Sequence, residues 1–231
     1  ANQNGIFAIC SLRMLLVHQK RKLLYLQTGS ILCIIKKTSS HCGAVPRERR
    51  QQGGFVMNDI IQAMETRRSI RQFKPDMPHK EDLQQIIEAG LYAANGRGRQ
   101  GAIILAVTNR ELRDRLSALN REIGGFPEGK DPFYGAPAVL IVLADKSCPT
   151  GIYDGSLVMG NLMLAAHALG LGSIWIHRAK EEFERPEYKQ LLKDLGVEGE
   201  WEGIGHCVVG YIDGEAPQPA PRRDGRVFWV E

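Results

Sequence analysis

Cysteine is sparse in this 231-residue chain and follows no pattern that would support a disulfide framework or a zinc site. The five cysteines are Cys10, Cys33, Cys42, Cys148 and Cys207. Their number is odd, their spacing is scattered, and no two form a C-x-x-C pair. Secreted domains that depend on disulfides carry dense cysteine sets, so this composition favours a reducing compartment, and we expect a cytoplasmic protein.

Three common catalytic signatures are also missing. No G-x-x-x-x-G-K-[ST] phosphate loop occurs anywhere in the chain. The stretch "LGLG" (169–172) contains G-x-G, but it ends a helical pattern where a dinucleotide fingerprint has to open one. "DGSLVMG" has a serine without the G-x-S-x-G elbow of an α/β-hydrolase.

Histidine provides no metal site by its spacing. No two of His79, His167, His177 and His206 stand at ligand spacing on one helix face, so we predict that the protein holds no metal. His167 lies in an apolar helical segment and favours a hydrogen-bonded core histidine over a catalyst. Cys207, in a strand, favours a small core hydrophobe over a nucleophile, and we assign no catalytic residue.

Charge is distributed unevenly along the chain. Residues 1–56 hold nine of the 30 Lys and Arg residues and one of the 26 acids, which gives a net charge of +8. Residues 57–231 therefore carry −4, although the chain as a whole carries +4. The basic balance does not make the whole chain a nucleic-acid binder, and we expect neither nucleic acid nor membrane as a partner of residues 57–231.

Residues 1–56 do not have the pattern of a folded domain. The apolar stretch 21–37, "RKLLYLQTGSILCIIKK", is interrupted by polar residues, is too short to cross a bilayer, and lacks the order of a secretory signal. The following segment, "HCGAVPRERRQQGG", is typical of a disordered linker. We therefore expect a basic, disordered leader over 1–56 and a single functional domain over 57–231.

The leader has two interpretations. "QQGGFV" precedes Met57, and Gly-Gly can be encoded as GGAGGN, which resembles a bacterial ribosome-binding site just upstream of an ATG. We hypothesise that 1–56 is upstream sequence read in frame and that the natural protein starts at Met57. The alternative is a basic arm that binds a membrane or nucleic acid.

From Met57 onward, helical and strand-like patterns alternate, which predicts a mixed α and β domain without repeats. After an opening helix capped by Asn58 or Asp59, the expected helices are 79–94, 109–123, 154–172 and 181–196, the last of them broken before Pro186. The expected strands are 101–108 and 137–145, both buried, and 173–176 and 203–212. The helix 154–172 is apolar nearly all round, which predicts burial on every side and a partner subunit. The last six residues, "RVFWVE", are strand-like and need a strand to pair with.

Arginine is concentrated at two places in the domain. Arg67, Arg68, Ser69 and Arg71 lie within five consecutive positions at the end of the opening helix, and "PAPRRDG" holds Arg222 and Arg223 near the C-terminus. A solvated charged surface explains such a cluster as well as a phosphate site does. The turn "AANGRGRQGAI" (93–103) adds glycines that let backbone N–H groups approach a ligand.

These segments together resemble the FMN-dependent nitroreductase family from Met57 to Glu231. The resemblance rests on the order and spacing of "RRSIRQF", "AANGRGRQGAIILAVTN", "YGAPAVLIVLAD", "DGSLVMGNLMLAAHALGLGSIWIHRAKEEF", "GIGHCVVGY" and "PAPRRDGRVFWVE". It implies an α+β three-layer sandwich, with a central mixed, mostly antiparallel sheet flanked by helices, assembled as an intertwined homodimer with FMN at the interface.

The resemblance also implies site residues. Arg67, Arg68, Ser69 and Arg71 would hold the FMN phosphate and ribityl chain, because guanidinium forks match phosphate oxygens, and Arg222 or Arg223 would complete the site. The two remaining pairs of implied cofactor contacts are Asn95 with Gln100, and the backbone at His177 and Arg178.

The loop departs from the usual family pattern. Ala94-Asn95 replaces Pro-Ser, Gly98 stands where Asn is usual, and Gln100-Gly101-Ala102 replaces Gln-Pro-Trp, so apolar bulk beside the flavin is missing. Backbone N–H groups near His177 and Arg178 match the family position that meets flavin N5 and O4, where a donor stabilises the reduced ring.

The implied activity is a ping-pong flavin oxidoreductase. NADH or NADPH would deliver hydride to FMN, and a nitroaromatic, a quinone or a similar small acceptor would then take the electrons. Two alternatives stay open: an FMN-binding or flavin-remodelling protein without foreign-acceptor reductase activity, and a basic binding module built on residues 1–56.

Overall fold

The computed structural model describes residues 58–231. The predictions for the leader over 1–56 and for a start at Met57 fall outside these residues. Within the described part of the chain, no helix combines the length and the apolar character needed to cross a membrane.

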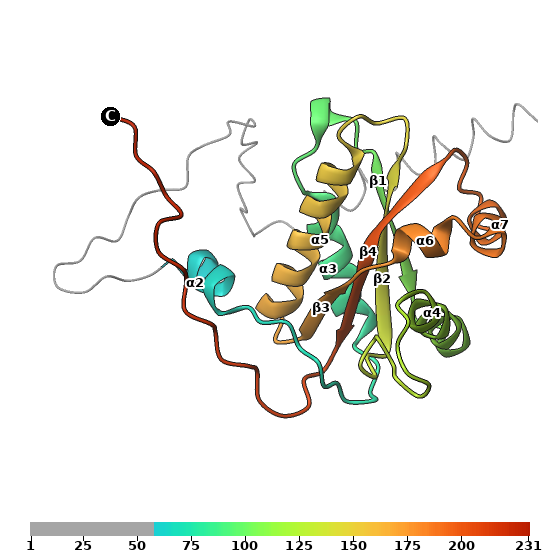
Figure 1. Cartoon of the computed structure of the whole chain (residues 1–231), viewed down its shortest axis with the longest axis horizontal. Coiled ribbons are helices and arrows are strands. Elements are labelled where there is room, and N and C mark those ends of the chain that lie inside the picture. The colour runs from blue at the N-terminus through green and yellow to red at the C-terminus, as the bar shows by residue number, and fades with distance from the viewer. Residues whose placement is uncertain (1–57) are drawn as a thin grey trace, which may run out of the picture. The chain divides into compact units, whose positions relative to one another are not determined.

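A four-stranded sheet forms the middle of the domain (Figure 1). Its strands are β1 (Ala102–Val107), β2 (Ala138–Asp145), β3 (Gly172–Ile176) and β4 (Trp201–Gly210), in the order β1-β2-β4-β3 with every neighbouring pair antiparallel. A parallel bridge between Ser69 and Ser173 makes the sheet mixed. β2 is buried along nearly its whole length, whereas β1 is only half-buried because it lies at an edge, contrary to the expectation of a fully buried strand.

Six helices surround the sheet, and their boundaries have identifiable causes. They are α2 (Asp59–Thr66), α3 (Lys80–Leu91), α4 (Arg110–Ile123), α5 (Gly151–Ala168), α6 (Ala179–Phe183) and α7 (Pro186–Asp194). Asn58 begins α2 by accepting the Ile60 N–H at 3.0 Å, and Asn109 begins α4 by accepting the Leu112 N–H at 2.9 Å. Pro186 occupies the first turn of α7, where its missing N–H costs nothing.

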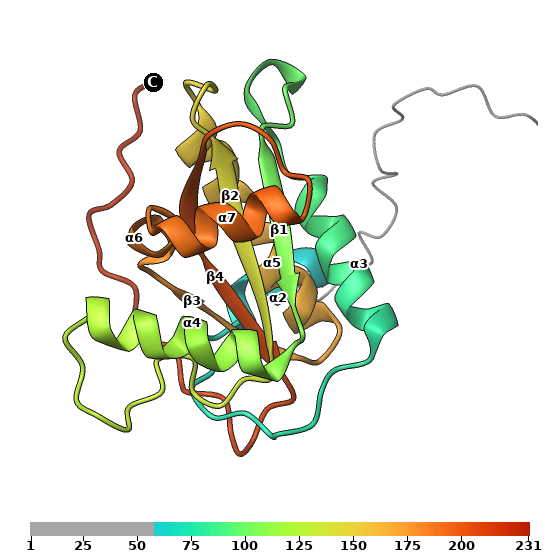
Figure 2. The ribbon, with the colours of Figure 1, turned by 90° about the vertical axis from the view of Figure 1, so that its right-hand side faces the viewer.

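Two apolar cores lie on opposite faces of the sheet, because successive strand residues point to opposite sides. Val139 and Ile141 of β2 face α4, α6 and α7, while Leu140 and Val142 face α3 and α5. Figure 2 shows the α4, α6 and α7 layer from its outer side. The predicted three-layer α+β sandwich is therefore confirmed.

One face of α5 lies open in the single chain. Ile152, Tyr153 and Leu157 are 55%, 72% and 50% exposed, so the expectation that this helix is buried on every side is not met within one subunit. The helix also spans 151–168, three residues earlier at its start than the pattern predicts. An apolar face of this kind is typical of a surface covered in an assembly.

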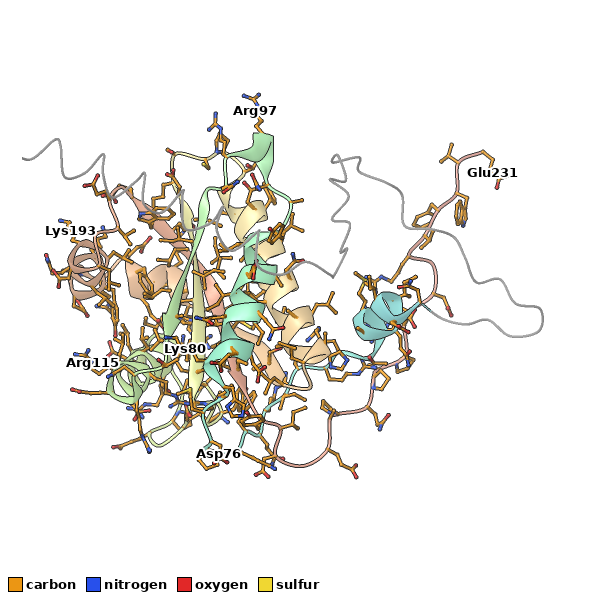
Figure 3. All side chains as sticks on the ribbon, turned by 180° about the vertical axis from the view of Figure 1, so that it is seen from behind. Asp76, Lys80, Arg97, Arg115, Lys193 and Glu231 are labelled. Carbon is orange, nitrogen blue, oxygen red and sulfur yellow. The ribbon has the colours of Figure 1, made fainter. Side chains whose placement is uncertain are left out.

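The C-terminal arm (213–231) follows β4 and contains no helix or strand. Val227, Phe228, Trp229 and Val230 are each at least 71% exposed. The expected strand over 226–231 is therefore not formed in the single chain, because no neighbouring strand pairs with it. Figure 3 shows the arm running out to Glu231.

Candidate functional site

The arginine segment runs along the free edge of β3. Directly after α2, Ser69 bridges to Ser173, and the Ile70 N–H donates to the Ser173 carbonyl at 3.1 Å. The Ile70 side chain is 4% exposed and packs into the core, which fixes the segment in place. The sequence prediction places these arginines at the end of a helix, and the structure adds that a strand edge holds them.

Two buried guanidinium nitrogens at this edge have no acceptor, and neither does an indole N–H that lies over Gly205 of β4. Among the described residues, Arg67 Nη1, Arg68 Nε and Trp175 Nε1 are the buried side-chain nitrogens or oxygens without a hydrogen-bond partner. Leaving a buried donor unpaired costs roughly 1–3 kcal/mol, and more for a charged group, so such groups call for an explanation. A ligand with several acceptor oxygens, such as a phosphate ester, would satisfy the two guanidinium nitrogens.

Arg68 also has a structural role. Its Nη1 donates to the carbonyls of Glu65 at 2.7 Å and Arg67 at 2.8 Å, which caps the C-terminal end of α2. The dipole at a helix C-terminus is negative, so α2 itself would not attract an anion, and binding would have to come from the guanidinium groups. Arg71 is exposed and donates to the Ser69 carbonyl at 3.5 Å.

The electrostatic environment of this edge is positive. Partial burial and the charges of Arg67 and Arg68 lower the pKa of His167 below its ordinary value of 6.5. Thr66 Oγ1 donates to the Gln62 carbonyl at 2.7 Å, so its contact with His167 Nε2 at 2.9 Å places the imidazole proton on Nε2. His167 is thus hydrogen-bonded, as the sequence predicts, and a dianion would compensate the positive charge.

Cys207 lies in β4 opposite Trp175 and is fully buried. Burial raises the pKa of its thiol to about 12, although Arg67 acts in the opposite direction. A thiol with so high a pKa is not a nucleophile at neutral pH. The prediction of a small core hydrophobe is confirmed.

His177 and Arg178 follow β3 directly, four and five residues beyond Ser173. At about 3.3 Å per residue, His177 lies roughly 13 Å along the strand edge from the arginine segment. The Arg178 side chain does not face this edge: its Nε donates to Asn120 Oδ1 of α4 at 3.0 Å, and its guanidinium lies over Phe126. The backbone of both residues and the exposed His177 side chain are available to a ligand at the edge.

The loop with Asn95 and Gln100 lies at the other edge of the sheet. It precedes β1, and Asp154 near the start of α5 accepts the Gly96 N–H at 3.0 Å. Asn95 closes the loop by accepting the Gln100 N–H at 3.0 Å, while the Gln100 side chain is exposed. β1 and β3 are separated by two strands, or roughly 14 Å at the usual strand spacing, so one subunit does not bring this loop to the arginines. Figure 3 shows Arg97 at the tip of the loop, directed away from the domain.

Arg222 and Arg223 are exposed in the C-terminal arm, and Arg222 donates to the Ala220 carbonyl at 3.0 Å. No described contact joins them to the segment at 67–71. Their predicted role at the phosphate stays a prediction.

A separate apolar groove of about 420 Å³ lies between α2, α3 and α5. Its lining is Asp59, Ile60, Ala63, Ala89, Asn161, Leu164, Ala165 and Ala168, and it includes none of the predicted cofactor contacts. No group of His, Cys, Asp and Glu side chains among residues 58–231 is arranged to hold a metal ion.

FMN fits the donors at the β3 edge. The cofactor offers a phosphate dianion for the two unpaired guanidinium nitrogens and polar ring atoms for N–H groups farther along the strand. The sequence predicts Arg67, Arg68 and Ser69 but misses the unpaired indole N–H of Trp175, which lies over Gly205 of β4 and not at the free edge. The only sequence signal is that Trp175 lies two residues after Ser173 in an expected strand, which puts the two side chains on one face of the sheet.

Comparison with known proteins identifies the family of this chain. The profile described as "Nitroreductase family" matches residues 64–211. A Methanothermobacter thermautotrophicus protein named NADH dehydrogenase/NAD(P)H nitroreductase is 30% identical over 124 residues, which are 51% of this chain and 60% of that protein. The FMN reductase (NAD(P)H) of Bacillus subtilis is 27% identical over 170 residues, which are 61% of this chain and 66% of that protein.

This chain thus spans a little less than two thirds of each of these two relatives. Among solved structures, a nitroreductase with bound FMN from Bacteroides fragilis aligns with a TM-score of 0.68 at 27% identity. The alignment covers 76% of this chain and 100% of that one.

Proposed function

The chain belongs to the nitroreductase family, and we propose that it is an NAD(P)H-dependent FMN oxidoreductase. The observation that carries the proposal is the pair of unpaired buried guanidinium nitrogens of Arg67 and Arg68, beside the free edge of β3. Cys207 is excluded as a nucleophile because burial raises the pKa of its thiol. In this proposal a bound cofactor supplies the redox chemistry.

In this proposal Arg67, Arg68 and Ser69 hold the phosphate of FMN, with Arg71 at the exposed margin. Guanidinium groups bind phosphate oxygens through charge-assisted hydrogen bonds, and the Ser69 hydroxyl adds a neutral donor. His167 stays neutral beside them because its pKa is lowered, so it adds no further positive charge to the site at neutral pH. The backbone N–H groups of His177 and Arg178 serve the flavin ring.

FMN held by these residues would supply hydride-transfer chemistry, and the chain would then link NADH or NADPH oxidation to reduction of a nitroaromatic, a quinone or a similar small acceptor in a ping-pong sequence. The chain's own residues bind and orient the cofactor. We assign no protein acid or base, and solvent supplies protons.

We further propose an intertwined homodimer, because the site is incomplete in one subunit. The loop bearing Asn95 and Gln100 lies at the β1 edge, whereas the arginines lie at the β3 edge. A second subunit would bring its loop to the flavin and its C-terminal arm, with Arg222 and Arg223, to the phosphate. The same contact would cover the open apolar face of α5.

Residues 57–231 carry all the proposed cofactor contacts. We propose that residues 57–231 are the functional unit, that the protein is cytoplasmic, and that it acts on small molecules without a nucleic-acid or membrane partner. A net charge of −4 over these residues is consistent with that assignment.

Steady-state oxidation of NADH and of NADPH, each with and without menadione and with and without added FMN, tests the function. The proposal expects menadione-dependent turnover that requires FMN and that riboflavin supports poorly. A protein that binds FMN tightly but oxidises neither nicotinamide with any acceptor would instead be the flavin-binding or flavin-remodelling alternative.

A further inference from the structure

A closed polar network is buried between the sheet, α4 and α6. Glu182 of α6 and His206 of β4 are both 0% exposed, and Glu182 Oε2 lies 2.8 Å from His206 Nε2. Asn120 of α4, also 0% exposed, donates from Nδ2 to Glu182 Oε1 at 2.6 Å. The mechanism proposed above uses none of these three side chains.

The outward side-chain hydrogen bonds of this network all reach three consecutive residues. His206 Nδ1 lies 3.2 Å from the Ile176 carbonyl, and Asn120 Nδ2 donates to the His177 carbonyl at 2.8 Å. Asn120 Oδ1 accepts from Arg178 Nε at 3.0 Å. A carbonyl only accepts, so His206 Nδ1 carries a proton, and one further proton is shared between His206 Nε2 and Glu182.

The backbone at Arg178 shows why such a hold is needed. Arg178 has φ 80° and ψ 7°, a left-handed conformation that side-chain-bearing residues rarely adopt. Strained backbone of this kind persists where surrounding contacts over-determine it. Here two carbonyl contacts and one side-chain hydrogen bond restrain the turn.

Because the peptide bond is planar, fixing a carbonyl also fixes the direction of the N–H group that follows it. In a trans peptide the C=O and the following N–H point in opposite directions. The Ile176 carbonyl points toward β4, so the His177 N–H points to the free edge of β3. The His177 carbonyl points toward α4, so the Arg178 N–H points away from α4. Neither N–H has an acceptor among the described residues.

We propose that Asn120, Glu182 and His206 are positioning residues that direct the His177 and Arg178 N–H groups at the flavin ring and so raise the reduction potential of bound FMN. The inference rests on the proposed function. A donor at the ring favours its reduced, electron-rich state, so loss of the alignment disfavours reduction.

A purely structural role explains the network less well. Replacing a buried charged or polar cluster by packed apolar side chains is often neutral or stabilising, so burial of the cluster is weak evidence for a stabilising role. A cluster needed for stability alone would not have to direct all its outward contacts to residues 176–178.

The test compares the FMN midpoint potential and the FMN dissociation constant of the full chain with those of three variants. Asn120→Ala removes the contacts to His177 and Arg178. Ser117→Ala is the matched control, because Ser117 is a buried residue of the same helix whose hydroxyl donates to Asp131 and touches nothing at 176–178. Glu182→Gln is the conservative variant, because its amide can donate to a neutral His206 while its oxygen still accepts from Asn120.

We expect Asn120→Ala to favour reduced over oxidised FMN about tenfold less than the wild type does. For a two-electron couple this corresponds to a midpoint potential about 30 mV more negative. Ser117→Ala and Glu182→Gln should keep the wild-type potential. An unchanged potential in Asn120→Ala, or an equal shift in Ser117→Ala, would overturn the inference and leave the proposed function intact.

Two further outcomes are also decisive. If Asn120→Ala does not fold, Arg178→Met removes one of the same restraints from a half-buried position, and its potential must then shift in the same direction. If the wild-type chain binds no FMN, both the inference and the proposed function are overturned.

Discussion

Ser69 pairs with Ser173 in a parallel bridge that joins the segment after α2 to the free edge of β3. This one relationship places Arg67 and Arg68 beside a strand whose continuation carries His177 and Arg178. A phosphate group and a planar ring on one cofactor can therefore be held by two ends of the same strand edge, roughly 13 Å apart.

Arg68→Ala and Ser69→Ala should each raise the FMN dissociation constant while the fold stays intact. A hydrogen bond to a charged group contributes about 1.5–3 kcal/mol, so loss of Arg68 should weaken FMN about tenfold to a hundredfold. Ser69 provides a neutral hydroxyl donor to the same dianion, and its loss should fall at the lower end. Fluorescence titration with FMN measures both effects.

Riboflavin and an unrelated arginine provide the controls for that experiment. Riboflavin has the ring without the phosphate, so it should bind weakly and respond little to either substitution. Arg115→Ala alters an exposed arginine on α4 and should leave FMN affinity unchanged. Equal losses for FMN and riboflavin in Arg68→Ala would make the arginines a solvated, helix-capping surface.

Leu157→Asp should dissociate the proposed dimer. Leu157 is 50% exposed on the open face of α5, and a carboxylate buried there without a partner would oppose association. Leu195→Asp is the matched control, because Leu195 is 54% exposed after α7 on the other side of the sheet. Sedimentation should give about twice the monomer mass for the wild type and for Leu195→Asp, and the monomer mass for Leu157→Asp. A monomeric, flavin-bound wild type would contradict the proposal.

A chain beginning at Met57 should bind FMN and assemble as the full chain does. The predicted contacts all lie beyond residue 57, and residues 1–56 hold a net charge of +8 without an ordered apolar pattern. Gel filtration and FMN titration of the shortened chain check this expectation. Loss of solubility or of flavin binding would show that the leader is structural, and salt-sensitive nucleic-acid binding that disappears with it would support the basic-arm alternative.

Asp131 should make the stability of the domain sensitive to acid. Burial raises the pKa of its carboxyl, but hydrogen bonds from Arg113, Ser117 and the Gly135 N–H together lower it by more. The net result is a pKa below its ordinary value of 3.8. Its contribution is complete above the unfolded pKa of 3.8 and is lost as the pH falls through the lower folded pKa.

The free energy of unfolding, measured with denaturant at about pH 6 and about pH 3, should therefore differ less between the two pH values in Asp131→Asn than in the wild type. Asp131→Asn should also be less stable at about pH 6, by roughly 1–3 kcal/mol, because the amide cannot accept all of these bonds. Asp76→Asn, at an exposed aspartate labelled in Figure 3, should behave as the wild type does. If the free energy of unfolding of Asp131→Asn changes with pH as much as that of the wild type, Asp131 is not the source of the acid sensitivity.

Periodicity predicted the helices and strands of the domain to within a few residues, because their apolar stripes are strong and their caps are explicit. The cap at Asn58 and the helix break before Pro186 are examples. Periodicity could not distinguish burial within a subunit from burial between subunits. The sequence therefore predicted burial on every side for the helix at 154–172, whose Leu157 the single chain leaves exposed, and a paired strand at 226–231, which the single chain does not form.

The site was only partly accessible from sequence. Arg67, Arg68 and Ser69 are adjacent, so their cluster is visible in the chain itself. Asn120, Glu182 and His206 lie far apart in sequence and meet only when α4, α6 and β4 pack together. The conflict between Asn95 at the β1 edge and the arginines at the β3 edge likewise appears only when the strand order is known.

Anaerobic titration of the FMN-loaded wild-type protein with NADH or NADPH, followed by menadione, tests the central claim most directly. The account predicts that at least one nicotinamide bleaches the visible flavin band in proportion to the amount added, and that menadione restores it. A flavin band that neither nicotinamide bleaches, or a purified protein that takes up no FMN, would contradict the claim that this chain is an FMN-dependent oxidoreductase.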